Sequence, residues 1–295
     1  MSGRALAALK APLRLLAPAL LLAAAAGCNS ADRAPAEQVA RVVWSGAEAA
    51  HGGFSGIEVG PEGRSFTAIS DRGRIVTGTL LRDAGGTLTG VRSGPLRPLR
   101  GAPDATPDAE GLAIASDGTL FVSAEGRHRI LHYDGAGGPA RPTRPAPAFA
   151  GLERNRGFEA LAIDADGTLW TLPEHGGDTI PLYRRDADGW QQVGTIPSAN
   201  GFVPVGADFG PDGALYLLER KFFGPLGFAS QVRRVTLDGP PRVRTLLTTG
   251  PGTHDNLEGL AVWRDPSGAL RLTMVSDDNF LFLQTTEIVE YRLRD

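Results

Sequence analysis

One motif occurs five times along this 295-residue chain and constrains its fold more than any other feature. The segment EGLAIASDGTLFVSAEG at 110–126 recurs as EALAIDADGTLWTLPEH at 159–175, and related copies lie at 55–72, 205–219 and 258–277. Their first residues are 55, 49, 46 and 53 residues apart, namely Ser55, Glu110, Glu159, Val205 and Glu258. Because repeats of this period indicate stacked or ring-arranged units, the chain is expected to contain five similar units.

Each unit has the sequence of a buried β-hairpin. In the copy at 110–126, Leu112 and Ile114 face one side of the first strand and Ala113 and Ala115 face the other, so both faces are apolar. An Asp-Gly pair follows in three copies and supplies the positive φ angles that a tight hairpin needs (Asp117-Gly118, Asp166-Gly167, Asp212-Gly213). No stretch keeps apolar residues at helical spacing over three turns, so the fold is expected to be all-β.

Five such units predict a β-propeller with five blades, or six if one blade has lost its signature. The segment EQVARVVW near the start and TEIVEYRLRD at the end both have strand character. An N-terminal strand is therefore expected to complete the last blade and close the ring, which removes free sheet edges. A β-sandwich would not explain the period.

The N-terminus predicts export. Three basic residues, Arg4, Lys10 and Arg14, precede an apolar run of 13 residues that stops at Cys28. This run is shorter than the roughly 20 residues of a membrane-spanning helix and has the form of a signal peptide at residues 1–27. Small residues before Cys28 resemble a bacterial lipobox, which predicts lipidation of its thiol. An ordinary signal peptide with a chance cysteine is the alternative.

The expected mature protein has a lipidated tether at residues 28–38 and a propeller domain at 39–295. It would lie in the cell envelope, anchored to a membrane through Cys28, with the domain in the periplasm or outside the cell. Without the leader the net charge is −6 and Lys221 is the only lysine, which argues against a nucleic-acid partner. Cys28 is the only cysteine, so the domain has no disulfide or thiol nucleophile. A monomer is expected.

The repeat geometry gathers carboxylates at one end of the central channel. Glu110, Glu159 and Glu258 precede the first strands, and the second strands end at the same face. Acidic residues close those second strands, at Asp71, Glu125, Glu174, Glu219 and the pair Asp277-Asp278, with Arg72, Arg220, Asn256 and Asn279 nearby.

Converging like charges need neutralisation, and a hard cation such as Ca²⁺ suits a set of carboxylates and amides without Cys or His ligands. The predicted calcium ligands are Glu110, Glu159, Glu258, Asp71, Glu125, Asp277 and Asn256, and the predicted catalytic residues are Glu110, Glu174, Asp278, Arg72 and Arg220. The alternative is that the acidic side chains cap strand ends and pair with arginines. His175 and His254 are the histidines that remain candidates for acid–base roles.

Seven short motifs follow one another along the chain, namely GFSGI, SDRG, AEGLA, NRGFEALA, LLER, DNLEGLA and VSDDNF. Through these motifs the chain resembles the phytase-like family, whose propeller domains are named for an esterase-like activity of phytase. The resemblance covers about Phe54 to Leu293. It implies an exported propeller whose acidic motifs form the site of a hydrolase acting on a small molecule.

Three functions follow as hypotheses. The first is a Ca²⁺-dependent hydrolase of ester or phosphoester bonds, in which the metal polarises the substrate and a carboxylate positions water. The second is a non-catalytic lipoprotein whose calcium-stiffened propeller binds a ligand or partner. The third resembles the gluconolactonase-type propellers, which hydrolyse lactones.

Overall fold

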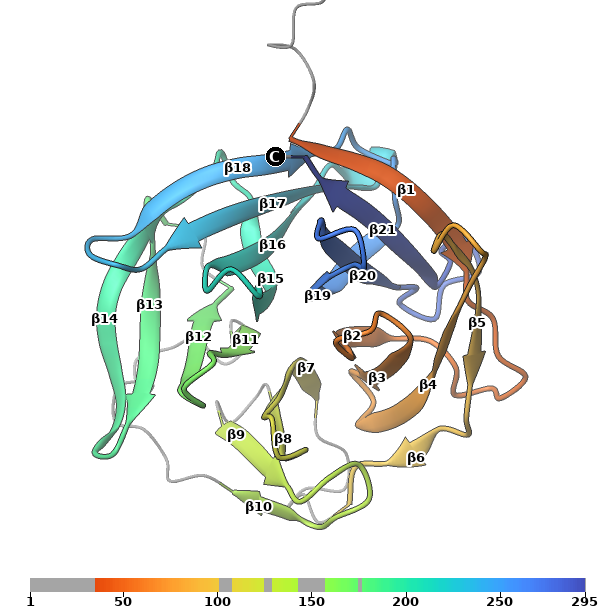
Figure 1. Ribbon diagram of the computed structural model, residues 1–295, viewed down its shortest axis with the longest axis horizontal. Helices are drawn as coiled ribbons and strands as arrows, with labels where there is room; N and C mark the ends of the chain where they lie inside the picture. The colour runs from red at the N-terminus through yellow and green to blue at the C-terminus, as the bar shows by residue number, and fades with distance from the viewer. Residues whose placement is uncertain (1–34, 101–107, 125–128, 143–156, 175–176, 295) are drawn as a thin grey trace, which may run out of the picture. The chain divides into compact units, whose positions relative to one another are not determined.

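The computed structural model describes residues 35–100, 108–124, 129–142, 157–174 and 177–294. They belong to one compact unit, Ala34–Asp295, which is built almost entirely of β-strands. Five sheets are arranged radially around a central channel, so the prediction of a five-bladed all-β propeller is confirmed (Figure 1). In the ranges given above, no helix has the length and apolar character needed to cross a membrane.

Each blade has four antiparallel strands that run in chain order from the channel outward, except that blade 1 has a short fifth strand and that the outermost strand of blade 5 comes from the N-terminal side of the domain. Blade 1 contains β2 (Phe54–Val59), β3 (Ser65–Ser70), β4 (Arg74–Arg82) and β5 (Leu88–Ser93), with β6 (Arg97–Pro98) paired to β4. Blade 2 contains β7 (Ala109–Ile114), β8 (Leu120–Ala124), β9 (Arg129–Tyr133) and β10 (Ala140–Pro142). Blade 3 contains β11 (Phe158–Ile163), β12 (Leu169–Pro173), β13 (Thr179–Asp186) and β14 (Gly189–Pro197). Blade 4 contains β15 (Val203–Phe209), β16 (Leu215–Phe222), β17 (Phe228–Thr236) and β18 (Arg242–Thr248).

Blade 5 closes the ring with strands from both ends of the domain. It contains, from the channel outward, β19 (Asn256–Arg264), β20 (Leu270–Asp277) and β21 (Glu287–Leu293), and β1 (Ala36–Val43) pairs antiparallel with β21 at the outer edge. This confirms the expected closure by an N-terminal strand. Because β1 begins at Ala36, the last three residues assigned to the tether belong to the domain instead.

In blades 2 to 5 the hairpins between first and second strands turn through three-residue loops, whereas the blade 1 loop between Gly60 and Ser65 has four residues. In blade 2 the Gly118 amide donates to the Ala115 carbonyl, and the Ala115 amide donates to Thr119. Only the glycine of the Asp-Gly pair has positive φ, at 86° for Gly118, which is the geometry of a type I turn followed by a left-handed residue. The sequence prediction of a tight turn is confirmed, whereas the expected positive φ at Asp117 is not observed.

The core lies between neighbouring blades. Trp44 and Phe54 stack with ring centroids 4.2 Å apart, and they pack in one buried cluster with Val76 of blade 1 and Val275 and Ile288 of blade 5. Similar apolar clusters fill the other described interfaces. The inner strands of adjacent blades are thereby held in close contact around the channel.

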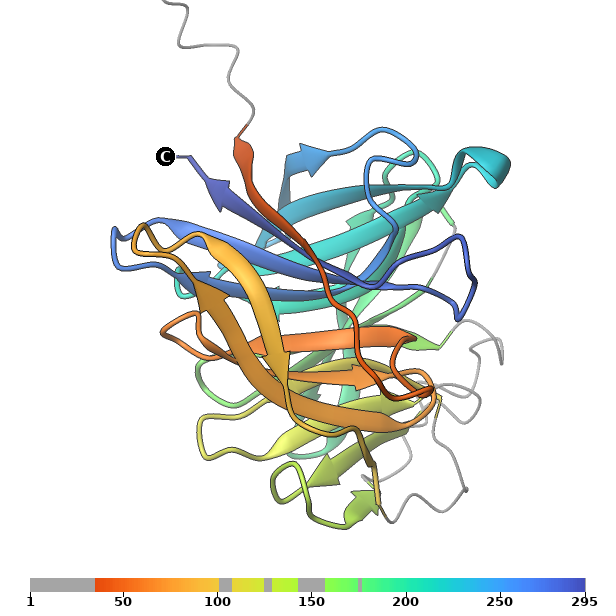
Figure 2. The same ribbon diagram turned by 90° about the vertical axis from the view of Figure 1, so that its right-hand side faces the viewer.

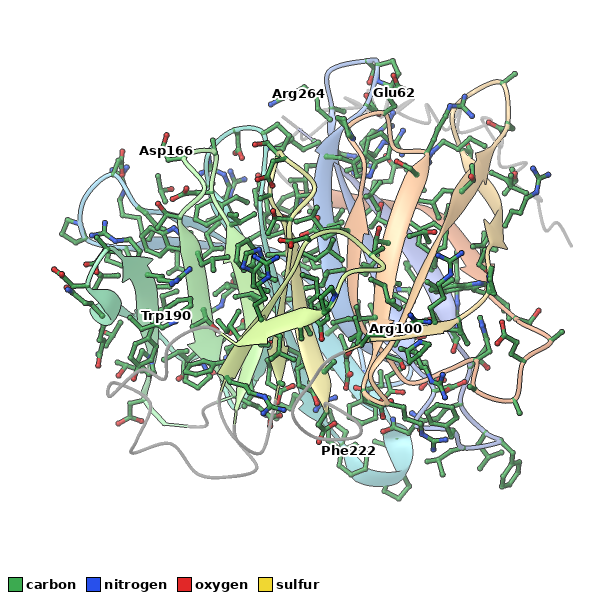
Figure 3. All side chains as sticks on the ribbon, turned by 90° about the horizontal axis from the view of Figure 1, so that it is seen from below. Glu62, Arg100, Asp166, Trp190, Phe222 and Arg264 are labelled. Carbon is green, nitrogen blue, oxygen red and sulfur yellow. The ribbon has the colours of Figure 1, made fainter. Side chains whose placement is uncertain are left out.

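The two ends of the channel are chemically distinct. We call the end where inner strands begin and second strands finish the mouth, and the end with the short hairpins the turn end. Figure 2 shows the loop after β16 and the loop after β20 projecting on one side and the β2–β3 and β19–β20 hairpins on the other. In Figure 3, Phe222 lies at the mouth, whereas Glu62, Asp166 and Arg264 lie at the turn end.

Candidate active site

Every inner strand is irregular at the first residue of its repeat. The register against the second strand shifts between Phe54 and Gly56, Ala109 and Leu112, Phe158 and Ala160, Pro204 and Gly206, and Leu257 and Gly259. These are β-bulges, which re-aim a side chain relative to the regular alternation of a strand. The bulged positions are those of Ser55, Glu110, Glu159, Val205 and Glu258, so one local distortion is repeated around the mouth.

The residue after each bulge is glycine or alanine, and the reason is steric. A Cβ atom at Gly206 would lie 2.4 Å from the backbone oxygen of Glu258, and one at Gly259 would lie 2.8 Å from the Ile57 amide nitrogen. A Cβ atom at Gly111 would similarly lie 2.7 Å from the Glu159 oxygen. Adjacent inner strands thus approach so closely that glycine is required, and this approach brings the acidic residues of neighbouring blades together.

Arg220, on β16, lies among these carboxylates. Its Nη1 donates to Oε1 of Glu258 and to Oδ1 of Asn256 (3.1 Å), and its Nη2 lies 3.5 Å from Oε1 of Glu174. Burial alone would lower the pKa of Arg220, but the charges of Glu258, Glu159, Glu174 and Glu110 together raise it above its usual value. One guanidinium therefore neutralises much of the acidic cluster. Pairing of the acidic side chains with an arginine was the alternative to a calcium site in the sequence analysis.

Asp71 and Asp277 form an acidic corner beside this arginine. Burial raises the pKa of Asp277 to about 8, with a further contribution from the Glu258 charge. Burial also raises the pKa of Asp71 to about 6, although the neighbouring Arg72 backbone amide and charge oppose the shift. Asp277 accepts a hydrogen bond from the Asn279 amide (2.6 Å), whereas Asp71 Oδ1 is buried and has no hydrogen-bond partner among the described residues.

Asp278 holds loops together. Its Oδ1 accepts from the Gly53 and Phe280 amides (3.0 and 3.1 Å), and its Oδ2 accepts from the Thr286 hydroxyl (3.1 Å). These contacts join blade 5 to the loop before β2, so the predicted catalytic role of Asp278 finds no support in this geometry. Arg72 stacks on Phe280 with its Cζ 3.3 Å from the ring centroid.

The structure therefore brings together most of the predicted site residues, in two groups. Glu110, Glu159, Glu174 and Glu258 influence Arg220, with Asn256 bonded to both Arg220 and Glu258. In the second group, the charges of Asp71 and Asp278 both act on Asp277 and help to raise its pKa. Glu125, His175 and Cys28 lie outside the described residues.

Two residues that the sequence analysis placed near the mouth, Glu219 and His254, have their side chains buried away from it. The expectation that Glu219 joins the cluster is wrong, because its side chain is fully buried inside blade 4 and pairs with Arg233. His254 is also buried, with its Nε2 bonded to the Tyr291 hydroxyl (2.7 Å) and its Nδ1 3.6 Å from Glu287. It precedes β19 and is held by two residues of β21, so its side chain is enclosed within the closing blade.

A pocket of about 340 Å³ opens beside Arg220. Its polar wall contains Glu174, Arg220, Lys221, Asn256 and Asn279, and its apolar wall contains Val203, Phe222 and Phe228. Lys221 donates to the Asn200 carbonyl (2.6 Å). The pocket thus offers two cations, a carboxylate and an aromatic surface to a small ligand, and the residues of its aromatic wall were not predicted from the sequence.

We tested the calcium prediction against these positions. Among the described residues, no group of three or more His, Cys, Asp or Glu side chains is placed to hold a metal ion. On the Arg220 side the guanidinium takes the place of a cation, so Glu258 does not fit a calcium site there. At the acidic corner, Asp71 has an oxygen without a hydrogen-bond partner among the described residues, and the pKa of Asp277 is raised. Both observations fit a site where a cation would neutralise the two carboxylates. Calcium stays a prediction, confined to that corner.

The opposite end of the channel holds a second carboxylate pair that the sequence analysis missed. Asp208 on β15 accepts from the Val262 amide (2.6 Å), and burial raises its pKa to about 7. Burial also raises the pKa of Glu58 on β2, with a further contribution from Asp208. Both line a cavity of about 1180 Å³ at the turn end. The sequence did contain a signal for this pair, because Glu58 and Asp208 are each an acidic residue within an otherwise apolar inner strand.

Comparison with known families gives one match. The family described as phytase-like, with esterase-like activity of phytase, matches residues 49–280 and so covers well over half of the chain. No curated protein matches the sequence significantly.

Solved structures share the fold at low sequence identity. A GH43 glycoside hydrolase engineered to show endo-xylanase and exo-arabinofuranosidase activity is 17% identical, with a TM-score of 0.52. The match covers 88% of this chain and 52% of the hydrolase, so this chain spans about half the length of the hydrolase. Virginiamycin B lyase from Staphylococcus aureus is 12% identical with a TM-score of 0.47, over 88% and 100% of the two chains. A streptogramin B lyase is 17% identical with a TM-score of 0.44, over 88% and 73%.

Proposed function

Because the chain belongs to the phytase-like family, we propose that it is a hydrolase of ester or phosphoester bonds and that the mouth of its channel is the reaction site. The observation that carries this proposal is the position of Arg220. It lines the pocket, and its charge is surrounded by carboxylates from three other blades. Such a fixed cation beside a carboxylate is the arrangement that stabilises the negative charge of a hydrolytic transition state.

Arg220 and Glu174 have complementary tasks in this proposal. The contact between Arg220 Nη2 and Glu174 Oε1 is long, at 3.5 Å, so this side of the guanidinium is available to an incoming oxygen. Glu174 then accepts a proton from water as the water oxygen attacks the carbonyl carbon or phosphorus. The ester C–O or P–O bond breaks, and the departing oxygen takes up the proton that Glu174 accepted, so that the carboxylate is restored. Asn256 orients Arg220 and Glu258 by bonding to both.

Calcium dependence is a finer proposal. Asp71 and Asp277 would hold the ion at the acidic corner, where hard oxygen ligands are available. When bound there, calcium would supply a Lewis acid that polarises a substrate oxygen. The unpartnered oxygen of Asp71 supports this assignment.

The test is an assay of the full chain against an aryl acetate, an aryl phosphate and a lactone, each with calcium and with a chelator. We expect turnover of at least one substrate, and loss of at least about 100-fold in Glu174→Gln, as is usual for a general base. Asp166→Asn is the matched control, since Asp166 is exposed at the turn end, and it should keep full activity. Absence of turnover in both conditions contradicts the hydrolase proposal, and lactone turnover alone assigns the third hypothesis instead.

A non-catalytic role is the second candidate, and one observation favours it. Arg220 already neutralises the carboxylates around it, and the oxygens of Asp278 are used by the loops, so much of the mouth is satisfied without a substrate. A binding protein would keep ligand-dependent thermal stabilisation in the Glu174→Gln variant and would show no turnover in the wild type.

Export and lipid anchoring are also proposals. The chain would reach the cell envelope through the leader at residues 1–27 and stay attached to a membrane through Cys28. Metabolic labelling with a tritiated fatty acid should mark the wild type and leave Cys28→Ala unlabelled. Labelling of both proteins would contradict the assignment.

A further inference from the structure

Two loops at the mouth expose large apolar side chains. Phe222 at the end of β16 and Phe223 and Leu226 in the β16–β17 loop form the first group, in which Leu226 is 67% exposed. The β20–β21 loop carries Leu281, Phe282 and Leu283, of which Phe282 is 95% exposed. We call these six residues the apolar rim. Clustered apolar side chains with such exposure mark a surface that binds something, because a folded protein otherwise buries them.

The apolar rim is continuous with the pocket at Arg220. Phe222 belongs to both, and Asn279, which also lines the pocket, lies in the same loop as Phe282. Both loops project from the mouth side of the propeller in Figure 2, on the neighbouring blades 4 and 5. A ligand bound at Arg220 that is longer than the pocket would therefore extend onto the apolar rim.

The loop after β20 is held in a fixed conformation. Asn279 and Phe280 both have positive φ, at 47° and 51°, which is costly for residues other than glycine. Asp255 compensates by accepting from the Gln284 side chain (2.7 Å) and the Thr285 amide (2.6 Å). The backbone is thus anchored while the side chains between these points remain exposed. Such pre-organisation lowers the entropic cost of binding.

Cations separate the apolar rim from the acidic cluster. Lys221 Nζ lies 5.2 Å from the Phe223 ring centroid, and Arg72 stacks on Phe280. Lys221 and Arg220 both line the pocket to which the rim residue Phe222 belongs, so they place positive charge at the inner edge of the apolar surface. This arrangement complements a molecule that carries an anionic group at one end and an apolar chain at the other.

Resting on the proposed function, we infer that the substrate is an amphiphilic ester whose polar group binds at Arg220 and Lys221 and whose acyl or alkyl chain packs on the apolar rim. A single molecule is favoured over a bilayer surface by the direction of β1. Ala36 pairs with Leu293 at the turn end, so a chain anchored at Cys28 would enter the domain at the end opposite to the apolar rim.

The experiment measures binding of octyl phosphate and ethyl phosphate to the full chain by calorimetry, with phospholipid vesicles of anionic composition as a third probe. Wild type should bind octyl phosphate about tenfold more tightly than ethyl phosphate, because part of the alkyl chain is buried. The variant Phe282→Ser/Leu283→Ser should abolish this difference and leave ethyl phosphate binding unchanged. Val193→Ser, an exposed apolar residue on β14, is the matched control and should behave as wild type.

Equal affinity for the two phosphates, or a chain-length effect that survives in the variant, would overturn the inference. Vesicle binding that depends on Phe282 without any octyl phosphate preference would also overturn it, in favour of a bilayer surface. The proposed function fails separately: rim-dependent binding without hydrolysis of any ester contradicts the hydrolase proposal alone. Hydrolysis whose rate is independent of chain length contradicts only the present inference.

Discussion

Arg220 on blade 4 and Glu258 on blade 5 form an ion pair across the mouth, and Glu258 Oε1 accepts simultaneously from the Arg220 guanidinium and the Asn256 amide (2.8 Å). Glu258 is 7% exposed, so the pair is largely removed from water. Removing one partner of such a pair leaves an uncompensated charge, which costs more than the pair itself contributes. The mouth is therefore sensitive to loss of this one arginine.

Arg220→Met is expected to lower the free energy of unfolding by about 3 kcal/mol, because Glu258 and its acidic neighbours lose their shared cation. Urea denaturation checks this value. The matched control is Arg242→Met, since Arg242 pairs with Asp238 in an exposed position and should cost less than about 1 kcal/mol. Equal effects for the two variants would show that Arg220 does not neutralise the cluster.

A second buried pair joins blade 1 to blade 5. Arg82 donates from Nη1 and Nη2 to the two carboxylate oxygens of Glu290 (2.8 and 2.5 Å), and its guanidinium lies 4.7 Å from the Trp263 ring centroid. Arg82→Met should cost about 3–5 kcal/mol in urea denaturation, because Glu290 has no exposure to water.

Combining Arg82→Met with Glu290→Leu should recover part of this loss, since no buried charge then remains. Arg264→Met, at an exposed position of the turn end, is the control and should stay near the wild-type value. A double variant that is less stable than Arg82→Met alone would contradict the explanation.

The repeat was sufficient to predict the blades because each copy encodes one hairpin with two apolar faces. The anchors Glu110, Glu159 and Glu258 were also correctly placed at the mouth, since strand order alone determines their end of the channel. The β-bulges at these positions were not predicted, because a bulge depends on how closely the neighbouring inner strand approaches.

The partners of the site residues were harder to predict than their positions. Glu219 follows the same repeat position as other acidic residues, yet Arg233 on the next strand of its own blade binds it. The residues of the apolar rim gave no periodic signal, because all except Phe222 lie in loops. The path of the β20–β21 loop depends on hydrogen bonds such as those of Asp255 and Asp278.

Asp208 should make stability depend on pH. Its pKa is raised to about 7 in the folded protein by burial, from an ordinary value near 3.8, so the folded state binds its proton more tightly. The free energy of unfolding therefore falls as the pH rises from about 4 to about 7. Asp208→Asn removes this contribution, and its stability relative to wild type should improve by about 3–4 kcal/mol across that window, at about 1.4 kcal/mol for each unit of the pKa difference.

Thermal or urea unfolding at several pH values checks the Asp208 prediction. Asp117→Asn at the same end of the channel is an informative control, because a hydrogen bond from the Thr119 amide lowers the pKa of Asp117. Its stability relative to wild type should fall as the pH rises toward about 4, because the wild type then gains the contribution of the ionised carboxylate, and should stay constant between about 4 and 7. Parallel pH profiles for wild type and Asp208→Asn would show that Asp208 titrates at its ordinary pKa.

Gly53 supports the acidic corner through the space it leaves. Its φ is 65°, and a Cβ atom there would lie 2.3 Å from Asp71 Oδ1 and 2.6 Å from the Phe280 ring. Gly86 has a similar φ of 81° but nothing within 4 Å of a Cβ atom, so Gly86→Ala isolates the cost of the backbone conformation, about 1 kcal/mol. Gly53→Ala should cost at least about 1 kcal/mol more, because Asp71 and Phe280 must also move. Urea denaturation of both variants compares these costs directly, and equal losses would show that the loop adjusts freely and that Gly53 does not position Asp71.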